Sequence, residues 1–241
     1  EDGKLTLYMH GATQGRKLDV LRKNPDLLNE WLKGNGFREN LKEKTPRIFT
    51  PGIAQESPHI GILNISDGCL DACSFCSTRL VKGKHRSVSP EKILSEAKRY
   101  LENGCKELWL TGQDTSCYGF DIGTNLAELA KKILEQNSGD YKIRLGMGNP
   151  RHLEKYLDEM LSVYEDDRIY KFIHLPVQSG SDSVLQAMGR KHNVNTFRKI
   201  AEAFISKFSY FTLSTDIIVG FPGETREDFE QTCKLISDLK P

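Results

Sequence analysis

The sequence has almost no net charge, no long apolar run and few cysteines. Its 34 Lys and Arg residues nearly balance 33 Asp and Glu residues, which excludes a nucleic-acid binder acting by bulk charge and an acidic tail. No apolar stretch approaches the ~20 residues of a membrane span, and the opening residues 1–10 lack the apolar core of a signal peptide. Six cysteines in 241 residues are too few for a disulfide-dense scaffold. The remaining composition, 38% hydrophobic and 28% charged, is typical of a globular domain.

Three of the six cysteines are grouped. Cys69, Cys73 and Cys76 form a C-x3-C-x2-C run, which favours metal binding over disulfides. Three thiolates suit a [4Fe-4S] cluster whose fourth iron stays open to a chelating small molecule such as S-adenosylmethionine. A zinc site is the alternative, with His85 as the fourth ligand, although its spacing fits no usual zinc finger. Three unrelated cysteines are the remaining interpretation.

Strand and helix patterns alternate from residue 60 onward. Five apolar segments indicate strands, at residues 60–66, 107–111, 142–147, 171–175 and 212–219. Helical faces follow Ser89-Pro90, Pro150, Asn195 and the Thr225–Asp228 capping box, and a further face begins at Leu126. Because crossovers in such βα units are right-handed, we expect a parallel α/β sheet. The cysteine loop follows the first strand, at the sheet edge where parallel folds keep their chemistry.

Residues 1–58 do not follow this alternation. They hold a candidate strand at 4–10, a helix beginning near Asn24-Pro25, and a Pro-rich loop or linker. We therefore expect two parts, an N-terminal segment of unassigned role at 1–58 and a catalytic core at 59–241.

The cysteine run and four further motifs resemble a known family. The motifs are Gly68–Cys76, Leu110–Asp114, His174–Ser179, Asp216–Thr225 and Gln113–Leu126. Together they are similar to the radical S-adenosylmethionine methylthiotransferases, and most similar to the archaeal and eukaryotic type. The resemblance implies a partial (β/α)6 barrel, here ending before its sixth strand. It also implies a [4Fe-4S] cluster, S-adenosylmethionine, and transfer of a methylthio group to N6-threonylcarbamoyladenosine at position 37 of tRNA, through a 5′-deoxyadenosyl radical.

The resemblance and the strand ends together suggest cofactor-binding residues. Cys69, Cys73 and Cys76 hold the cluster, and the expected contacts to S-adenosylmethionine come from Phe75, Gln113, Asp114, Arg144, Gln178, Ile218 and Gly220. Ser179 is a further candidate for touching ribose or the target base. Simpler roles remain open: Phe75 as loop packing, Asp114 as a turn cap, Arg144 in a salt bridge to a neighbouring strand, and Gly220 at a plain strand end. No catalytic side chain is assigned, since the cofactor carries the chemistry.

Partners follow from the same comparison. A basic run just past the cysteines, Arg79, Lys82, Lys84, His85 and Arg86, either steers a tRNA anticodon loop or is a solvated loop. The other cysteines, Cys105, Cys117 and Cys233, are expected to be packing or idle thiols. An electron donor such as flavodoxin or ferredoxin and a reducing cytoplasm complete the expectation, with no membrane.

Two departures from the family leave alternatives open. Residues 1–68 contain no cysteine, whereas the family carries three N-terminal cysteines for a second [4Fe-4S] cluster. The family also usually ends in a small RNA-binding β-domain, which these 241 residues do not include, so we expect an excised core. The alternatives are a radical S-adenosylmethionine enzyme that acts on RNA without inserting sulfur, and a non-catalytic iron–sulfur RNA-binding module.

Overall fold

A computed structural model describes residues 58–241. The expectations for residues 1–57, including the strand at 4–10 and the helix after Asn24, lie outside the described residues. None of the helices within 58–241 has the length and apolar character needed to cross a membrane.

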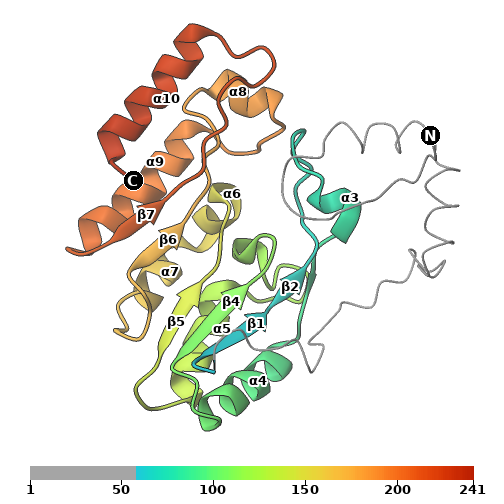
Figure 1. The fold of residues 1–241 in the computed structure, drawn as a ribbon, viewed down its shortest axis with the longest axis vertical. Helices are drawn as coiled ribbons and strands as arrows, with labels where there is room; N and C mark the ends of the chain where they lie inside the picture. The colour runs from blue at the N-terminus through green and yellow to red at the C-terminus, as the bar shows by residue number, and fades with distance from the viewer. Residues whose placement is uncertain (1–57) are drawn as a thin grey trace, which may run out of the picture. The chain divides into compact units, whose positions relative to one another are not determined.

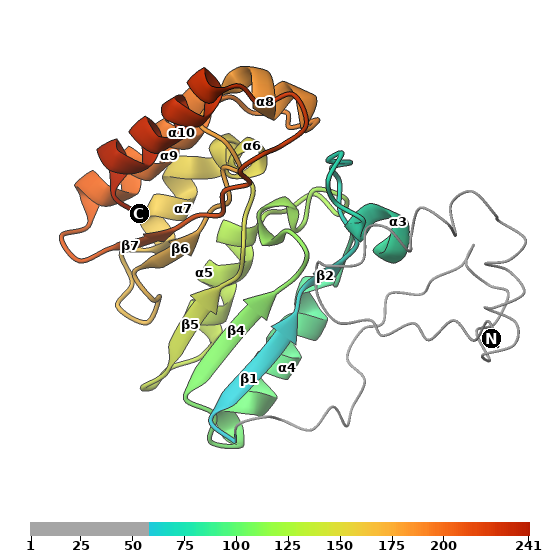
Figure 2. The same cartoon turned by 45° about the horizontal axis from the view of Figure 1, so that its top comes forward.

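The strands form a parallel sheet in two pieces. β1 (Ile60–Asn64), β4 (Glu107–Thr111) and β5 (Lys142–Leu145) pair in that order, and β6 (Phe172–His174) pairs with β7 (Thr212–Ser214). All three pairings are parallel. A bridge between Ile143 and Ile169 and the Gly148 N to His174 O hydrogen bond of 2.9 Å connect the pieces. Figures 1 and 2 show the five strands side by side in chain order. The predicted α/β fold of an open, partial barrel with parallel strands is confirmed.

The helices pack on one face of these strands (Figure 2). They are α4 (Pro90–Glu102), α5 (Leu126–Gln136), α6 (Pro150–Leu153), α7 (Leu157–Val163), α9 (Val194–Lys207) and α10 (Arg226–Leu239). In β4, Leu108 and Leu110 are fully buried in the core with Ile93 and Ile133, whereas Trp109 between them is half-buried. Because strand side chains alternate in direction, Trp109 lies on the opposite face.

Capping explains several helix starts. The Asn125 side chain accepts from the amide of Glu128, and Thr225 with Asp228 forms the predicted capping box. The expectation for α9 was wrong by two residues, because Asn193 rather than Asn195 is the N-cap and accepts from the amide of Thr196. The helix expected after Pro150 is interrupted by a 3-10 turn, η2 (Glu154–Tyr156), before α7 begins.

Short elements around the first strand escaped the pattern analysis. The strand expected at 60–66 ends at Asn64, and β2 (Ser66–Asp67) then pairs antiparallel with β3 (Arg86–Ser87). The 212–219 segment is a strand only to Ser214. Three short helical elements were also not predicted: α3 (Thr78–Lys82), η1 (Thr115–Cys117) and α8 (Asp182–Ala187).

Candidate functional site

The cysteine loop lies between β2 and α3, next to the carboxyl ends of β1 and β4 (Figure 1). Its first turn depends on Gly68, which has a φ of 77°. A Cβ at Gly68 would lie 2.2 Å from the carbonyl oxygen of Lys84, so only glycine fits there. The amide of Gly68 donates to Gln113 Oε1 at 2.8 Å, which fastens the loop to the end of β4.

Backbone hydrogen bonds hold the loop both to the end of α8 and to its own neighbouring residues. The Ser74 amide donates to the carbonyl of Met188 at 2.9 Å, at the end of α8. The Cys69 amide donates to Gly83 O at 3.3 Å and the Cys76 amide to Cys73 O at 3.1 Å. Segments separated by more than 100 residues therefore fix the loop.

The three thiols suit a metal cluster. All three are free, with Cys69 and Cys73 half-buried and Cys76 exposed. Burial raises the pKa of Cys69 to about 11, with the charges of Asp114 and Asp71 adding to the rise. Nitrogen donors face two of the sulfurs: Arg190 Nη1 lies 3.5 Å from Cys73 Sγ, and the Thr78 amide lies 3.4 Å from Cys76 Sγ. Three soft donors on one loop with N–H groups toward the sulfurs fit a [4Fe-4S] cluster.

Arg190 is a site residue that the sequence analysis missed. It lies in the turn between α8 and α9, 117 residues from Cys73. Its Nη2 donates to Asn149 Oδ1 at 3.3 Å and to the Pro176 carbonyl at 3.2 Å, while its buried Nε has no hydrogen-bond partner among the described residues. The guanidinium is thereby directed at the Cys73 sulfur. The turn between the two helices shows no local sequence pattern that would mark Arg190 as a site residue.

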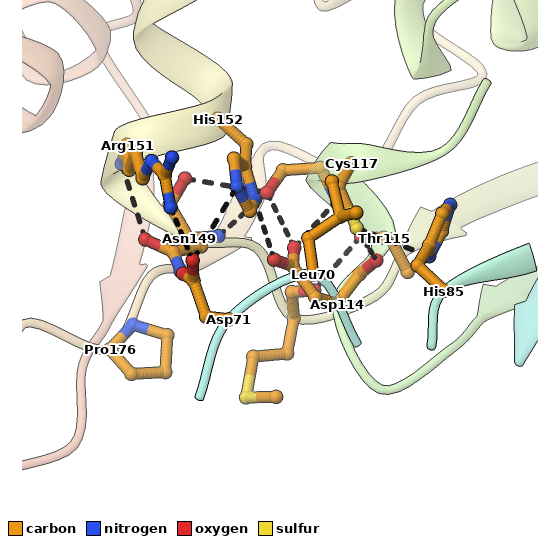
Figure 3. A network of polar contacts seen from close by, with 12 residues as sticks. Leu70, Asp71, His85, Asp114, Thr115, Cys117, Asn149, Arg151, His152 and Pro176 are labelled. Atoms are coloured by element: carbon orange, nitrogen blue, oxygen red, sulfur yellow. Dashed lines mark hydrogen bonds and ion pairs between the residues drawn. The ribbon is translucent and has the colours of Figure 1, made fainter. Parts of the chain in front are cut away.

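Asp71 is a second residue that was missed. It lies inside the C-x3-C segment and is buried. It accepts from Asn149 Nδ2 at 2.6 Å and from Arg151 Nη1 at 2.5 Å, and its Oδ1 lies 4.0 Å from His152 Nε2 (Figure 3). This network ties the cysteine loop to the N-terminus of α6. The sequence shows an Asp between cysteines, but its partners are about 80 positions away.

The Asp114 carboxylate caps the turn after β4, so it is not free to bind a ligand without losing these contacts. It is buried, and its Oδ1 accepts from the amide and the hydroxyl of Ser116 at 3.0 and 2.5 Å. Its Oδ2 lies 2.8 Å from His152 Nδ1 (Figure 3). Both oxygens are therefore engaged by the protein, which matches the simpler interpretation of this residue. A cofactor contact by Asp114 stays a prediction.

Phe75 and Arg144 lie in different surroundings. Phe75 is on the exposed part of the cysteine loop. Arg144 lies between two rings on neighbouring strands, 5.2 Å from the centroid of Trp109 and 5.1 Å from that of Phe172. Cation–π contacts thus take the place of the salt bridge considered from the sequence. Its role toward a ligand stays a prediction.

The segments that follow β6 and β7 lie side by side and are joined by backbone hydrogen bonds. The Gln178 amide donates to Asp216 O and the Ile218 amide to Gln178 O, each at 2.9 Å. Gln178 has a φ of 79°, a rare conformation for a residue with a side chain. Gly220 has a φ of 74° and open space where a Cβ would lie. The structure thus brings Gln178, Ile218 and Gly220 into neighbouring positions, and their cofactor contacts stay predictions.

Four expectations need correction. His85 is buried rather than part of an exposed basic run, and its Nδ1 lies 3.3 Å from Cys117 Sγ. It therefore lies against Cys117 instead of completing a zinc site with the cysteine loop. Cys233 is exposed on α10 rather than packed, whereas Cys105 is buried as expected. Ser179 is fully buried, with its hydroxyl 3.3 Å from that of Thr232, so it faces no ligand space.

Comparison with known proteins identifies related sequences and folds. The family model of the Radical SAM superfamily matches residues 63–236. A probable threonylcarbamoyladenosine tRNA methylthiotransferase of Pyrococcus horikoshii is 50% identical over 200 residues, 83% of this chain and 47% of that protein. The threonylcarbamoyladenosine tRNA methylthiotransferase of Homo sapiens is 38% identical over 222 residues, 89% of this chain and 38% of that protein. The chain therefore spans less than half the length of these relatives.

Two solved structures have a similar fold. A cobalamin-dependent S-adenosylmethionine radical enzyme, OxsB, with S-adenosylmethionine bound, superposes with a TM-score of 0.57 at 16% identity. The superposition covers 73% of this chain and 26% of that one. A radical S-adenosylmethionine methyltransferase, TsrM, from Kitasatospora setae with a [4Fe-4S] cluster bound gives 0.57 at 13% identity, over 75% and 35% of the two chains. At these identities the likeness concerns the fold alone.

Proposed function

The chain belongs to the radical SAM superfamily, and from this membership we propose that it is the catalytic core of a tRNA methylthiotransferase. The substrate we infer is N6-threonylcarbamoyladenosine next to the anticodon, at position 37, which would gain a 2-methylthio group. The observation that carries the proposal is the three-cysteine loop at the strand ends, in a chain 50% and 38% identical to relatives with that activity in their names.

The residues have separable roles in this proposal. Cys69, Cys73 and Cys76 hold a [4Fe-4S] cluster, which when bound supplies the electron for reductive cleavage of S-adenosylmethionine. Gln113 keeps the loop in place through the Gly68 amide, and Arg190 places a donor on the Cys73 sulfur. Both act before any substrate arrives, because their partners are protein atoms.

The same proposal covers ligand contacts. Arg144 offers a guanidinium whose faces are occupied by Trp109 and Phe172 and which forms no hydrogen bond within residues 58–241, so its donors are available to a carboxylate. Phe75, Gln113, Gln178, Ile218 and Gly220 are the further candidates around S-adenosylmethionine. An oxygen-sensitive cluster requires a reducing compartment, so we also propose a cytoplasmic setting and a donor of the flavodoxin or ferredoxin class.

The test uses oxygen-free reconstituted protein. The 241-residue chain should bind about four irons and, once reduced, release 5′-deoxyadenosine and methionine from S-adenosylmethionine. Cys73→Ala should lose both properties, whereas Cys233→Ala, an exposed thiol on α10, should keep both. Equal iron content and cleavage in Cys73→Ala would overturn the assigned site.

Substrate choice is tested separately. Cluster-loaded protein is incubated with a reductant, S-adenosylmethionine as the source of the radical and the methyl group, sulfide as the sulfur source, and tRNA that carries threonylcarbamoyladenosine. This mixture should yield the methylthio nucleoside in a nuclease digest, detected by mass spectrometry. tRNA lacking the threonylcarbamoyl group is the matched control. Cleavage of S-adenosylmethionine without a methylthio product, also in a longer form of the protein spanning the length of its relatives, would favour a radical enzyme that does not insert sulfur.

A further inference from the structure

A second group of metal-type donors lies beneath the cysteine loop. Asp114 is the N-cap of η1, Cys117 is the last residue of η1, and His152 comes from α6. One ligand atom from each of the three lies within 4.8 Å of the other two, and all three side chains are buried. Figure 3 shows them directed at one another. The group is separate from the three cysteines that the cluster uses.

We propose that Asp114, Cys117 and His152 bind one divalent metal ion of the zinc type. The set offers a carboxylate, a thiolate and an imidazole, which are the three donor kinds that protein zinc sites use. Hard cations such as Mg²⁺ and Ca²⁺ take oxygen ligands and are disfavoured by sulfur and nitrogen.

The separations suit such a site. With bonds of about 2.0–2.3 Å in a tetrahedral arrangement, ligand atoms lie roughly 3.3–3.6 Å apart. Here the Asp114 Oδ2 to His152 Nδ1 distance is 2.8 Å and the remaining pairs lie within 4.8 Å. The three ligand atoms therefore lie within about 1.3 Å of the required spacing.

The surroundings resemble those of metal ligands. Metal-bound histidines usually direct their second nitrogen at a carboxylate, and His152 Nε2 lies 4.0 Å from Asp71 Oδ1. Metal-bound thiolates usually accept N–H groups, and Cys117 Sγ lies 3.3 Å from His85 Nδ1 and close to the Leu70 backbone. The binding residues and their supports thus come from four separate segments.

Binding of a metal ion would hold the cysteine loop in place. Leu70 and Asp71 both lie between Cys69 and Cys73, and they contact Cys117 and His152 respectively. A metal ion at this point would fix the base of the cysteine loop from below, independently of the cluster itself. Without metal, the same contacts form only a buried hydrogen-bonded network, and the experiment must separate these two states.

The test removes the cluster first. In the full chain with Cys69, Cys73 and Cys76 changed to Ser, purified protein should retain about one zinc per chain by plasma mass spectrometry. Replacement by Co²⁺ should give the intense near-ultraviolet band of a cobalt–thiolate bond. Adding Cys117→Ala or His152→Gln should weaken cobalt binding roughly tenfold or more, and Cys117→Ala should abolish that band. Adding Cys233→Ala instead should change neither.

Two results would overturn the proposal. The first is zinc well below one per chain and equal in all variants, which means an adventitious ion only. The second is a cobalt spectrum without the thiolate band in the cluster-free protein that still contains Cys117. This second measurement requires no substitution at the site, so it decides the question even if Cys117→Ala fails to fold.

Discussion

Arg190 lies against the cysteine loop and directs a hydrogen-bond donor at one of its three sulfurs. Its guanidinium touches the Cys73 sulfur and is anchored by Asn149 and the Pro176 carbonyl. Hydrogen bonds to cluster sulfurs raise reduction potential, and residues that support metal ligands are commonly worth 10- to 100-fold in affinity or activity.

We expect Arg190→Gln to lower iron retention or S-adenosylmethionine cleavage about 10- to 100-fold and to shift the cluster potential to more negative values. Iron assay and a redox titration followed by electron paramagnetic resonance measure both. Arg198→Gln, which removes an arginine paired with Asp238 elsewhere on the surface, is the control and should leave them unchanged. A wild-type potential in Arg190→Gln would contradict the role.

At the scale of elements, the β2–β3 hairpin decides where the cysteine loop begins. Gly68 and Gly83 both have positive φ, 77° and 83°, so alanine costs roughly 1–3 kcal/mol of backbone strain at either position. Only at Gly68 would the new Cβ meet backbone, at 2.2 Å from Lys84 O, whereas at Gly83 the space is open.

Gly68→Ala should therefore displace the loop and lose most bound iron. Gly83→Ala should keep its iron, and its free energy of unfolding should fall only by the cost of the backbone strain. Urea unfolding and iron assay of the two variants make the comparison. Equal iron loss in both variants would show that strain, and not the contact with Lys84, controls the loop.

Pattern analysis succeeded where an element is long and regular. β4 and the helix from Leu126 were predicted closely, because Leu108 and Leu110 alternate and the residues from Leu126 to Leu134 form an amphipathic run. The hairpin of Ser66–Asp67 with Arg86–Ser87 is too short to show a period. In α9, Asn193 and Asn195 are both acceptable caps, and only the three-dimensional structure selects the first.

The site was half visible for a related reason. The three cysteines are neighbours in the sequence, so their spacing was enough to predict them as metal ligands. Arg190, Asp71 and His152 act through partners 38 to 117 positions away, and no local pattern reports such contacts. Charged or polar residues buried at strand ends were the only available signal, and it pointed to Asp114 without revealing His152.

For the molecule as a whole, buried imidazoles connect the site to stability. His192 is buried close to Arg190, and burial together with the charge of Arg190 lowers its pKa to about 3. The Val177 backbone and the Asp71 carboxylate oppose this shift, and His152 adds to it. The folded protein therefore keeps His192 neutral at pH values where the unfolded chain, with a pKa near 6.5, takes up a proton.

Because the unfolded state binds the extra proton, stability from this residue is complete above about pH 6.5 and falls as the pH drops toward 3, by about 1.4 kcal/mol per pH unit. In urea unfolding between pH 7.5 and 4.5, the free energy of unfolding should fall less steeply with decreasing pH in His192→Leu than in the wild type. The difference in slope should approach that of one proton, about 1.4 kcal/mol per pH unit. Carboxylates with lowered pKa, such as Asp166, add to the decline in both proteins and cancel in the comparison. His174→Gln, a half-buried histidine beside Asp216, should keep the wild-type contribution of His192. Parallel curves for wild type and His192→Leu would contradict the prediction, because they would mean that folding does not lower the pKa of His192.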